Sequence, residues 1–121
     1  MTTRYGYSLV DWKKAKKEMK KILIERAEVR GMITYSELTE KVKTIHLEPD
    51  SYALAAMLGE ISTEEDAAER GMLSVIVVHR YGDMQPGSGF FELAEELGRD
   101  TNDILTCWVK ELKKVHAYWS T

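Results

Sequence analysis

A histidine and an arginine, His79 and Arg80, follow directly after the most apolar segment of the chain, residues 72–78. An imidazole is suited to proton transfer because its pKa lies near neutrality. A guanidinium can hold a phosphate or a carboxylate through two hydrogen bonds. The spacing therefore predicts a site at the end of a buried segment, with His79 and Arg80 as candidate catalytic residues.

A glycine-rich loop follows this pair and leads into a helix-like segment, residues 90–97. Its residues Gly87, Ser88 and Gly89 allow backbone N–H groups to approach a ligand, and a helix N-terminus attracts anions. Together with Tyr35, they form the predicted ligand loop. The alternative is a tight turn with Ser88 as helix N-cap and a histidine that only bonds a loop carbonyl, since no triad spacing accompanies it.

The sequence offers no pattern for a metal or a cofactor. No two of its three histidines are three or four residues apart, and Cys107 is its only cysteine. We therefore expect no metal, no cofactor and no internal disulfide.

Length and composition indicate one globular domain over residues 1–121. The chain is 44% hydrophobic and 31% charged, which is typical of a folded protein. It has no apolar run near the roughly 20 residues that span a bilayer, and residues 1–5 lack a signal-peptide core. We expect a cytoplasmic protein without a membrane partner.

Charge is unevenly distributed along the chain. Residues 1–30 carry nine Lys/Arg and four Asp/Glu, a net +5, whereas the rest carries eight and sixteen, a net −8. A cluster of lysines in the first helix could attract phosphates, which gives the candidate nucleic-acid contacts Lys13, Lys16, Lys17, Lys20 and Arg80. The alternative is a solvated helix face, and the pI near 5.6 argues against strong non-specific DNA binding.

Apolar periodicity and capping residues predict the elements. Helices are expected at 8–30, 36–42, 50–62 with a further turn to 70, and from about 101 onwards; strands are expected at 32–35 and 72–79. This order predicts an α+β, mostly helical domain: a winged-helix-like core with a small antiparallel sheet and two added C-terminal helices. Residues 81–88 would form the wing. Residues 89–91 are either a returning strand or the start of a helix.

Two short motifs carry a resemblance to the winged-helix domain of DNA-alkyltransferase and alkyltransferase-like proteins. Ile-Thr-Tyr-Ser-Glu-Leu at 33–38 is similar to their strand-to-helix entry, and Val-Val-His-Arg at 77–80 to their Pro-Cys-His-Arg segment. The position that matches the alkyl-accepting cysteine is Val78, so alkyl transfer by that mechanism is not expected. The segment that matches the DNA-reading helix, residues 50–62, contains no Lys or Arg, which argues against duplex binding through it.

A second resemblance covers most of the chain. The segments 34–38, 72–79, 86–91 and 115–119 look like those of a family of small uncharacterised bacterial proteins, and this likeness implies no activity.

Three functions remain open at this stage. The first is a winged-helix-like nucleic-acid-binding or regulatory accessory protein without catalysis. The second is a small hydrolase or transferase that uses His79, Arg80, Tyr35 and the loop Gly87–Gly89. The third is a protein-interaction module or homodimer.

Overall fold

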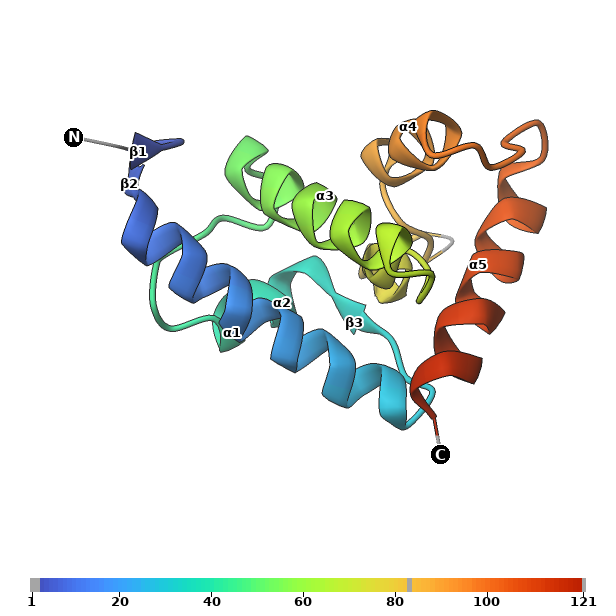
Figure 1. Ribbon diagram of the computed structural model, residues 1–121, viewed down its shortest axis with the longest axis horizontal. Coiled ribbons are helices and arrows are strands. Elements are labelled where there is room, and N and C mark those ends of the chain that lie inside the picture. The colour runs from blue at the N-terminus through green and yellow to red at the C-terminus, as the bar shows by residue number, and fades with distance from the viewer. Residues whose placement is uncertain (1–2, 83, 121) are drawn as a thin grey trace.

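The computed structural model describes residues 3–82 and 84–120. Two long helices, α1 (Leu9–Glu28) and α3 (Tyr52–Ala67), pack side by side, and α4 (Ser88–Glu96) and α5 (Ile104–Trp119) follow at the other end of the molecule (Figure 1). The predicted α+β, mostly helical class with two added C-terminal helices is confirmed. No helix of the described residues is long and apolar enough to cross a membrane.

Local capping signals identified two helix starts correctly. The Ser8 hydroxyl accepts a hydrogen bond from the N–H of Asp11 at the start of α1, and Thr34 does the same for Glu37 at the start of α2 (Tyr35–Lys41), both at 3.1 Å. Other predicted starts were wrong by one or a few residues. The N-cap of α3 is Ser51 and not Asp50, and α5 begins only after Asp103. The α3 helix also runs unbroken to Ala67.

The prediction of a strand over residues 72–79 was wrong. Leu73–Ile76 form a 3-10 helix, η1, and only Val77–Val78 form a strand, β4. Burial was predicted correctly, since every residue from Met72 to Val78 is buried. An unbroken apolar run indicates burial on all sides but does not distinguish a strand from a helix.

Side chains from α3 and α5 make hydrogen bonds to the backbone groups at and around η1. The Glu111 carboxylate accepts the N–H of Met72 at 2.8 Å, and the Ser62 hydroxyl accepts the N–H of Ser74 at 2.9 Å. The indole N–H of Trp108 donates to the carbonyl of Val75 at 3.1 Å. Buried backbone groups must find partners, so this segment needs no sheet.

The core pair of strands is parallel. Strand β3 (Ile33–Thr34) pairs with β4 in the register Ile33 with Val77 and Thr34 with Val78. The antiparallel sheet of the molecule is instead an N-terminal hairpin, β1 (Thr3–Arg4) with β2 (Tyr7–Ser8), which the sequence analysis did not predict. Residues 89–91 are helical, so no strand returns after the wing and the core sheet has two strands in the described part of the chain.

Ion pairs fasten α3 to its neighbours. The carboxylate of Glu65, 1% exposed, bonds Arg70 within the same segment and Lys20 of α1 at 3.3 Å. Burial alone would raise the pKa of Glu65, but the hydrogen bonds from Arg70 and Lys20 outweigh it and lower the pKa below its ordinary value.

We expect Glu65→Gln to destabilise the fold by roughly 1.5–3 kcal/mol at neutral pH, the usual worth of hydrogen bonds to a charged group. A carboxylate with a lowered folded-state pKa stabilises the protein above its unfolded pKa, and this contribution is lost as pH falls through the folded pKa. The difference between variant and wild type should therefore shrink below about pH 4.5, the ordinary value. Urea unfolding at several pH values measures it.

Glu25→Gln is the matched control, because Glu25 is an exposed residue of α1. An equal loss in both variants, or a pH-independent loss in Glu65→Gln, would contradict this account of the ion pair.

Candidate binding cleft

A cleft of about 960 Å³ lies between α3, α4 and the end of the parallel strand pair. Its floor is apolar and comes from α3 and α4, through Leu54, Leu58, Phe90 and Leu93. Pockets that bury small ligands have about this size, up to roughly 1,000 Å³, and usually combine an apolar lining with a few polar groups. The predicted site residues outside α1 all line this cleft, namely Tyr35, His79, Arg80, Gly87, Ser88 and Gly89.

Strand register brings Tyr35 and His79 together. Thr34 pairs with Val78, so the next residue of each strand, Tyr35 and His79, leaves the sheet at the same edge. Their rings lie 5.1 Å apart at 42°. The sequence analysis placed the two residues in one candidate site, but it could not give the cause, which is the parallel pairing of β3 and β4.

A third residue, Gly87, closes the cluster. Its backbone N–H donates to the Tyr35 hydroxyl at 2.9 Å. A Cβ at Gly87 would stand 3.2 Å from the Nε2 atom of His79 and 3.5 Å from the Tyr35 hydroxyl. Close approach of the backbone to both side chains therefore explains the glycine. Burial raises the pKa of Tyr35, partly offset by the Gly87 hydrogen bond, so its hydroxyl remains protonated at neutral pH.

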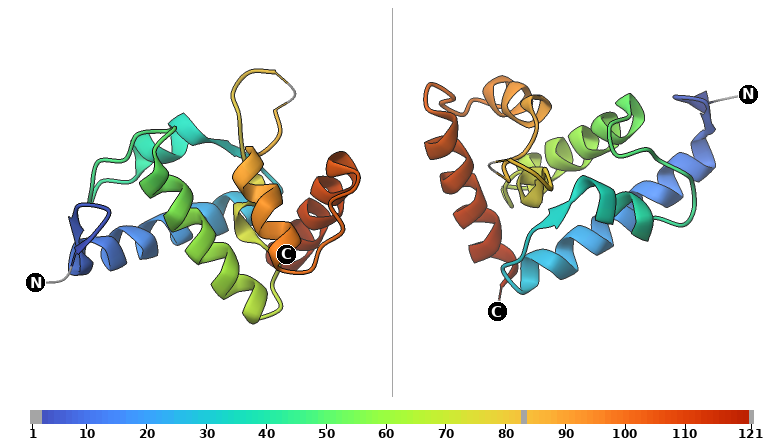
Figure 2. Two further views of the ribbon diagram at one scale, coloured as in Figure 1. Left: turned by 90° about the horizontal axis from the view of Figure 1, so that it is seen from above. Right: turned by 180° about the vertical axis from the view of Figure 1, so that it is seen from behind.

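Arg80 and the start of α4 give the cleft its positive side. The guanidinium of Arg80 lies over the Tyr81 ring at 5.7 Å, is exposed, and has no ion pair among the described residues. The N-cap of α4 is Gly87, without a side-chain hydrogen bond, so the expectation of Ser88 as N-cap was wrong. The segment between β4 and α4, which holds this arginine, projects from the body of the molecule (Figure 2).

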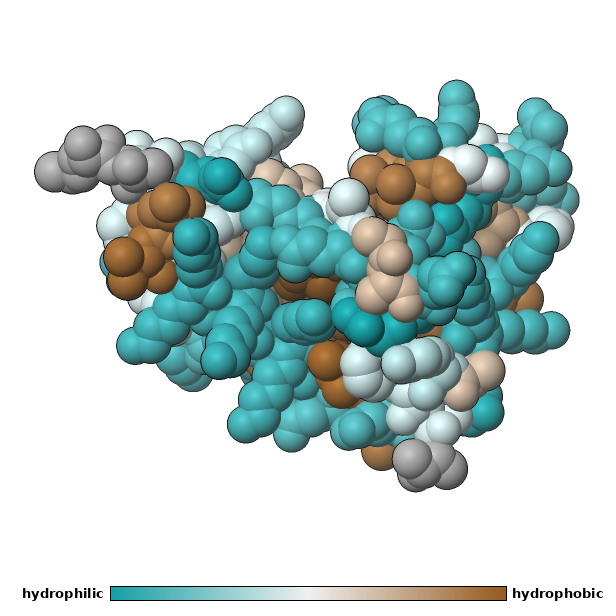
Figure 3. Space-filling view, viewed as in Figure 1, coloured by the Kyte–Doolittle hydropathy of each residue, from teal (hydrophilic) through white to brown (hydrophobic). Residues whose placement is uncertain are grey.

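Carboxylates outnumber cations around the cleft. Asp50, Glu92 and Glu96 line it, against Arg80 as the one Lys or Arg among its described lining residues. Figure 3 shows that one face of the molecule is mainly hydrophilic, with small and separate apolar patches at the start of α1 and over α4. The cleft therefore has an apolar floor, and its charged lining residues are mostly acidic.

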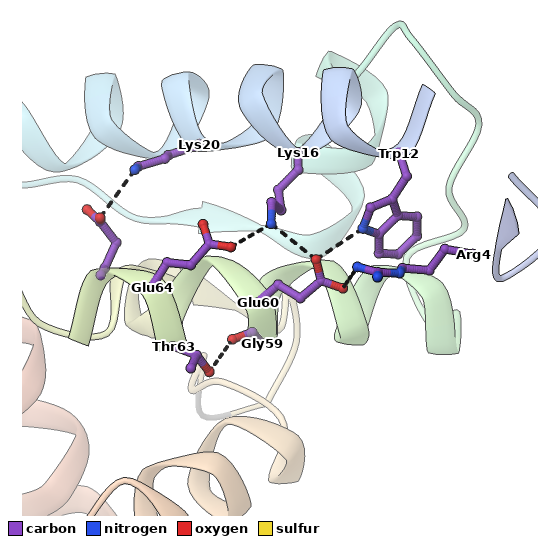
Figure 4. Close-up of polar contacts among 9 residues, drawn as sticks. Arg4, Trp12, Lys16, Lys20, Gly59, Glu60, Thr63 and Glu64 are labelled. Atoms are coloured by element: carbon purple, nitrogen blue, oxygen red, sulfur yellow. Dashed lines mark hydrogen bonds and ion pairs between the residues drawn. The ribbon is translucent and has the colours of Figure 1, made fainter. Parts of the chain in front are cut away.

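The candidate lysines of α1 do not reach this cleft. Lys16 bonds Glu60 at 3.2 Å and Glu64 at 2.6 Å, and Lys20 pairs with Glu65, so both lie against α3 (Figure 4). Lys13 and Lys17 are exposed. None of the four lines the cleft, and the structure thus separates the lysine cluster from Arg80.

Two residues that the sequence analysis missed also line the cleft, Tyr5 and Tyr52. Tyr5 stands at the turn of the N-terminal hairpin, followed by Gly6. Two-residue hairpin turns commonly have glycine in second place, usually after asparagine or aspartate and not after tyrosine, so Tyr5-Gly6 matches only half of the pattern. That partial signal was present in residues 3–8.

The groups around the His79 ring determine what catalysis it could support. No described hydrogen bond to a carboxylate orients the His79 ring, and no group of three metal-ligating side chains occurs in residues 3–82 and 84–120. Asp83 lies outside the described residues.

No protein-family model, curated protein or solved structure matches the chain.

We expect Tyr35→Phe to loosen the loop before α4, because the N–H of Gly87 loses its acceptor. A neutral hydrogen bond contributes about 0.5–1.5 kcal/mol, so the Gly87 amide should exchange with solvent about 2- to 12-fold faster. Hydrogen exchange followed by NMR measures this at the single residue. Tyr81→Phe serves as the control, because the Tyr81 side chain is 80% exposed. Unchanged exchange at Gly87 in Tyr35→Phe would show that this bond does not hold the loop.

Proposed function

We propose that the protein is a non-catalytic nucleic-acid-binding protein that holds an unpaired base in this cleft. The observation that carries the proposal is the convergence of Tyr35, His79, Arg80 and Gly87–Gly89 on one apolar recess. Unpaired bases are recognised by stacking on aromatic and guanidinium planes together with a few hydrogen bonds. The cleft provides both kinds of group.

The apolar floor supports a base more readily than a fully charged ligand. Leu54, Leu58 and Phe90 would cover its faces, while the Tyr35 hydroxyl and the His79 ring offer hydrogen bonds at its edge. Arg80 has no ion pair within the described residues and is free to take the adjoining phosphate, where a charge-assisted bond is strong. In such a complex, the apolar side chains, the two polar rings and the guanidinium would each contact a different part of one nucleotide.

Charge favours a single strand over a duplex. Groove binding depends on many phosphate contacts, yet α3 contains no Lys or Arg, and Lys16 and Lys20 are already paired with its carboxylates. Binding that rests on one cation and on stacking needs few phosphate contacts. The proposal therefore keeps nucleic acid as the partner but not the winged-helix mode of reading a groove with α3.

The likeness to alkyltransferase-like proteins agrees with binding without reaction. Val78, which stands where those enzymes have the acceptor cysteine, is 1% exposed. The single cysteine, Cys107, is buried in α5 and does not line the cleft. Burial raises the pKa of its thiol, so it is a poor nucleophile.

A small hydrolase or transferase is the second candidate, because His79 stands exposed at the cleft beside Tyr35. The protonated Tyr35 hydroxyl cannot act as a base at neutral pH, so His79 would be the one general base of the described cluster. Under this alternative, His79→Gln abolishes turnover of a substrate while it leaves ligand binding measurable. Under the binding proposal, no turnover accompanies binding in the wild type.

We expect the wild type to bind a labelled (dT)10 single strand in preference to the matching duplex. Arg80→Gln should weaken this binding roughly 10- to 150-fold, the equivalent of one hydrogen bond to a charged group. Each phosphate neutralised on a single strand contributes about −0.7 to the slope of log K against log salt. The wild-type slope should therefore be shallow, near −0.7, and close to zero in Arg80→Gln. Fluorescence anisotropy at several salt concentrations measures both quantities.

Lys13→Gln and Lys17→Gln are the matched controls, because both lysines are exposed and lie outside the cleft. A steep salt slope, with binding lost in the lysine variants and kept in Arg80→Gln, would place the interface on α1 and refute the cleft proposal.

A further inference from the structure

The cleft carries a second aromatic surface, formed by Tyr5 and Tyr52. Both residues line the cleft, and their rings lie 5.6 Å apart. Tyr5 is 50% exposed and Tyr52 is 78% exposed, so a large part of each side chain is available to a ligand. Neither ring has a described contact with Tyr35, His79 or Gly87.

The backbone of the hairpin adopts an unfavourable conformation that presents Tyr5. Tyr5 has φ 53°, and Gly6 follows with φ 88°. Two successive positive φ values match the hairpin turn that asparagine and glycine usually occupy. A side chain such as tyrosine is disfavoured in this region by roughly 1–2 kcal/mol. Strain of this kind is often retained at binding sites.

Polar contacts fix this hairpin against α3. Glu60 of α3 accepts from Arg4 at 3.2 Å and from the indole N–H of Trp12 at 3.1 Å (Figure 4). The Tyr7 hydroxyl donates to the carbonyl of His46 at 2.6 Å. Tyr5 stacks on the buried Trp12, with centroids 5.3 Å apart and planes at 29°. These contacts position Tyr5 beside Tyr52 without a ligand.

We infer that Tyr5 and Tyr52 form a second stacking subsite, which takes the base next to the one held at Tyr35 and Arg80. This inference rests on the proposed function and specifies its ligand as at least two consecutive unpaired nucleotides. Both aromatic groups line the same cleft. Arg4 and Lys16 are engaged by Glu60, so stacking and not phosphate attraction would hold the second base.

The experiment compares two probes, thymidine 5′-monophosphate and the tetranucleotide (dT)4, by NMR titration of the full chain. Tyr5→Ala and Tyr52→Ala should each weaken (dT)4 binding about 5- to 150-fold, the range measured when one stacking residue is removed. Binding of the monophosphate should not change in either variant. Tyr52→Phe should bind (dT)4 as the wild type does, because the ring and not the hydroxyl makes the contact.

Tyr118→Ala is the matched control, since Tyr118 is a 54% exposed tyrosine on α5 that does not line the cleft. The Tyr52→Ala variant should fold normally, because the Tyr52 side chain is exposed and contributes little to the core. Its result is therefore not confounded by a folding defect.

Each other outcome has a definite meaning. If Tyr52→Ala binds (dT)4 normally while Arg80→Gln weakens both probes, the second subsite is refuted and the proposed function stands. If neither probe binds the wild type, both fail. Aromatic grooves also hold proline-rich peptides, so displacement of (dT)4 from Tyr5 and Tyr52 by an oligoproline that binds more tightly would overturn the inference in favour of a peptide.

Discussion

The backbone N–H and C=O groups of residues 72–78 are buried and must find hydrogen-bond partners within the protein. The rest of the structure depends on this requirement. Every residue of the segment is buried. An unpaired buried backbone group costs about 1–3 kcal/mol, so partners must come from elsewhere in the fold. Glu111 and Trp108 of α5 and Ser62 of α3 supply them for η1, and β3 supplies them for β4. These bonds dock both helices on one segment and fix where β4 ends.

The position at which β4 ends determines the cleft. Because β4 is parallel to β3 and two residues long, Tyr35 and His79 emerge side by side, and the loop that follows must return close enough for Gly87 to bond Tyr35. Charge then separates the molecule into two regions. Lys16 and Lys20 of α1 are paired with carboxylates of α3, whereas Arg80 is exposed at the cleft. The cleft, and with it the proposed base-binding site, follows from topology and not from net charge.

Much of this fold could be predicted from the sequence, because helices are local. The hydroxyls of Ser8 and Thr34 mark helix starts through bonds to residues three positions on, and the apolar stripes show which faces are buried. The convergence of Tyr35, His79 and Gly87 was also predicted, although without its cause. The 3-10 geometry of η1 could not be predicted, since partners on distant helices replace the sheet. The parallel pairing and the pairing of Lys16 with Glu60 likewise arise from contacts between residues far apart in the chain.

The most direct test of the account is an NMR map of the amide signals that (dT)4 shifts in the uniformly ¹⁵N-labelled protein. If the end of β4 and the loop before α4 form the binding surface, the largest shifts fall on Tyr35, His79, Arg80 and Gly87, and the amide signals of Lys13 and Lys17 stay unchanged. Shifts confined to α1, or the absence of shifts at saturating oligonucleotide, would contradict it.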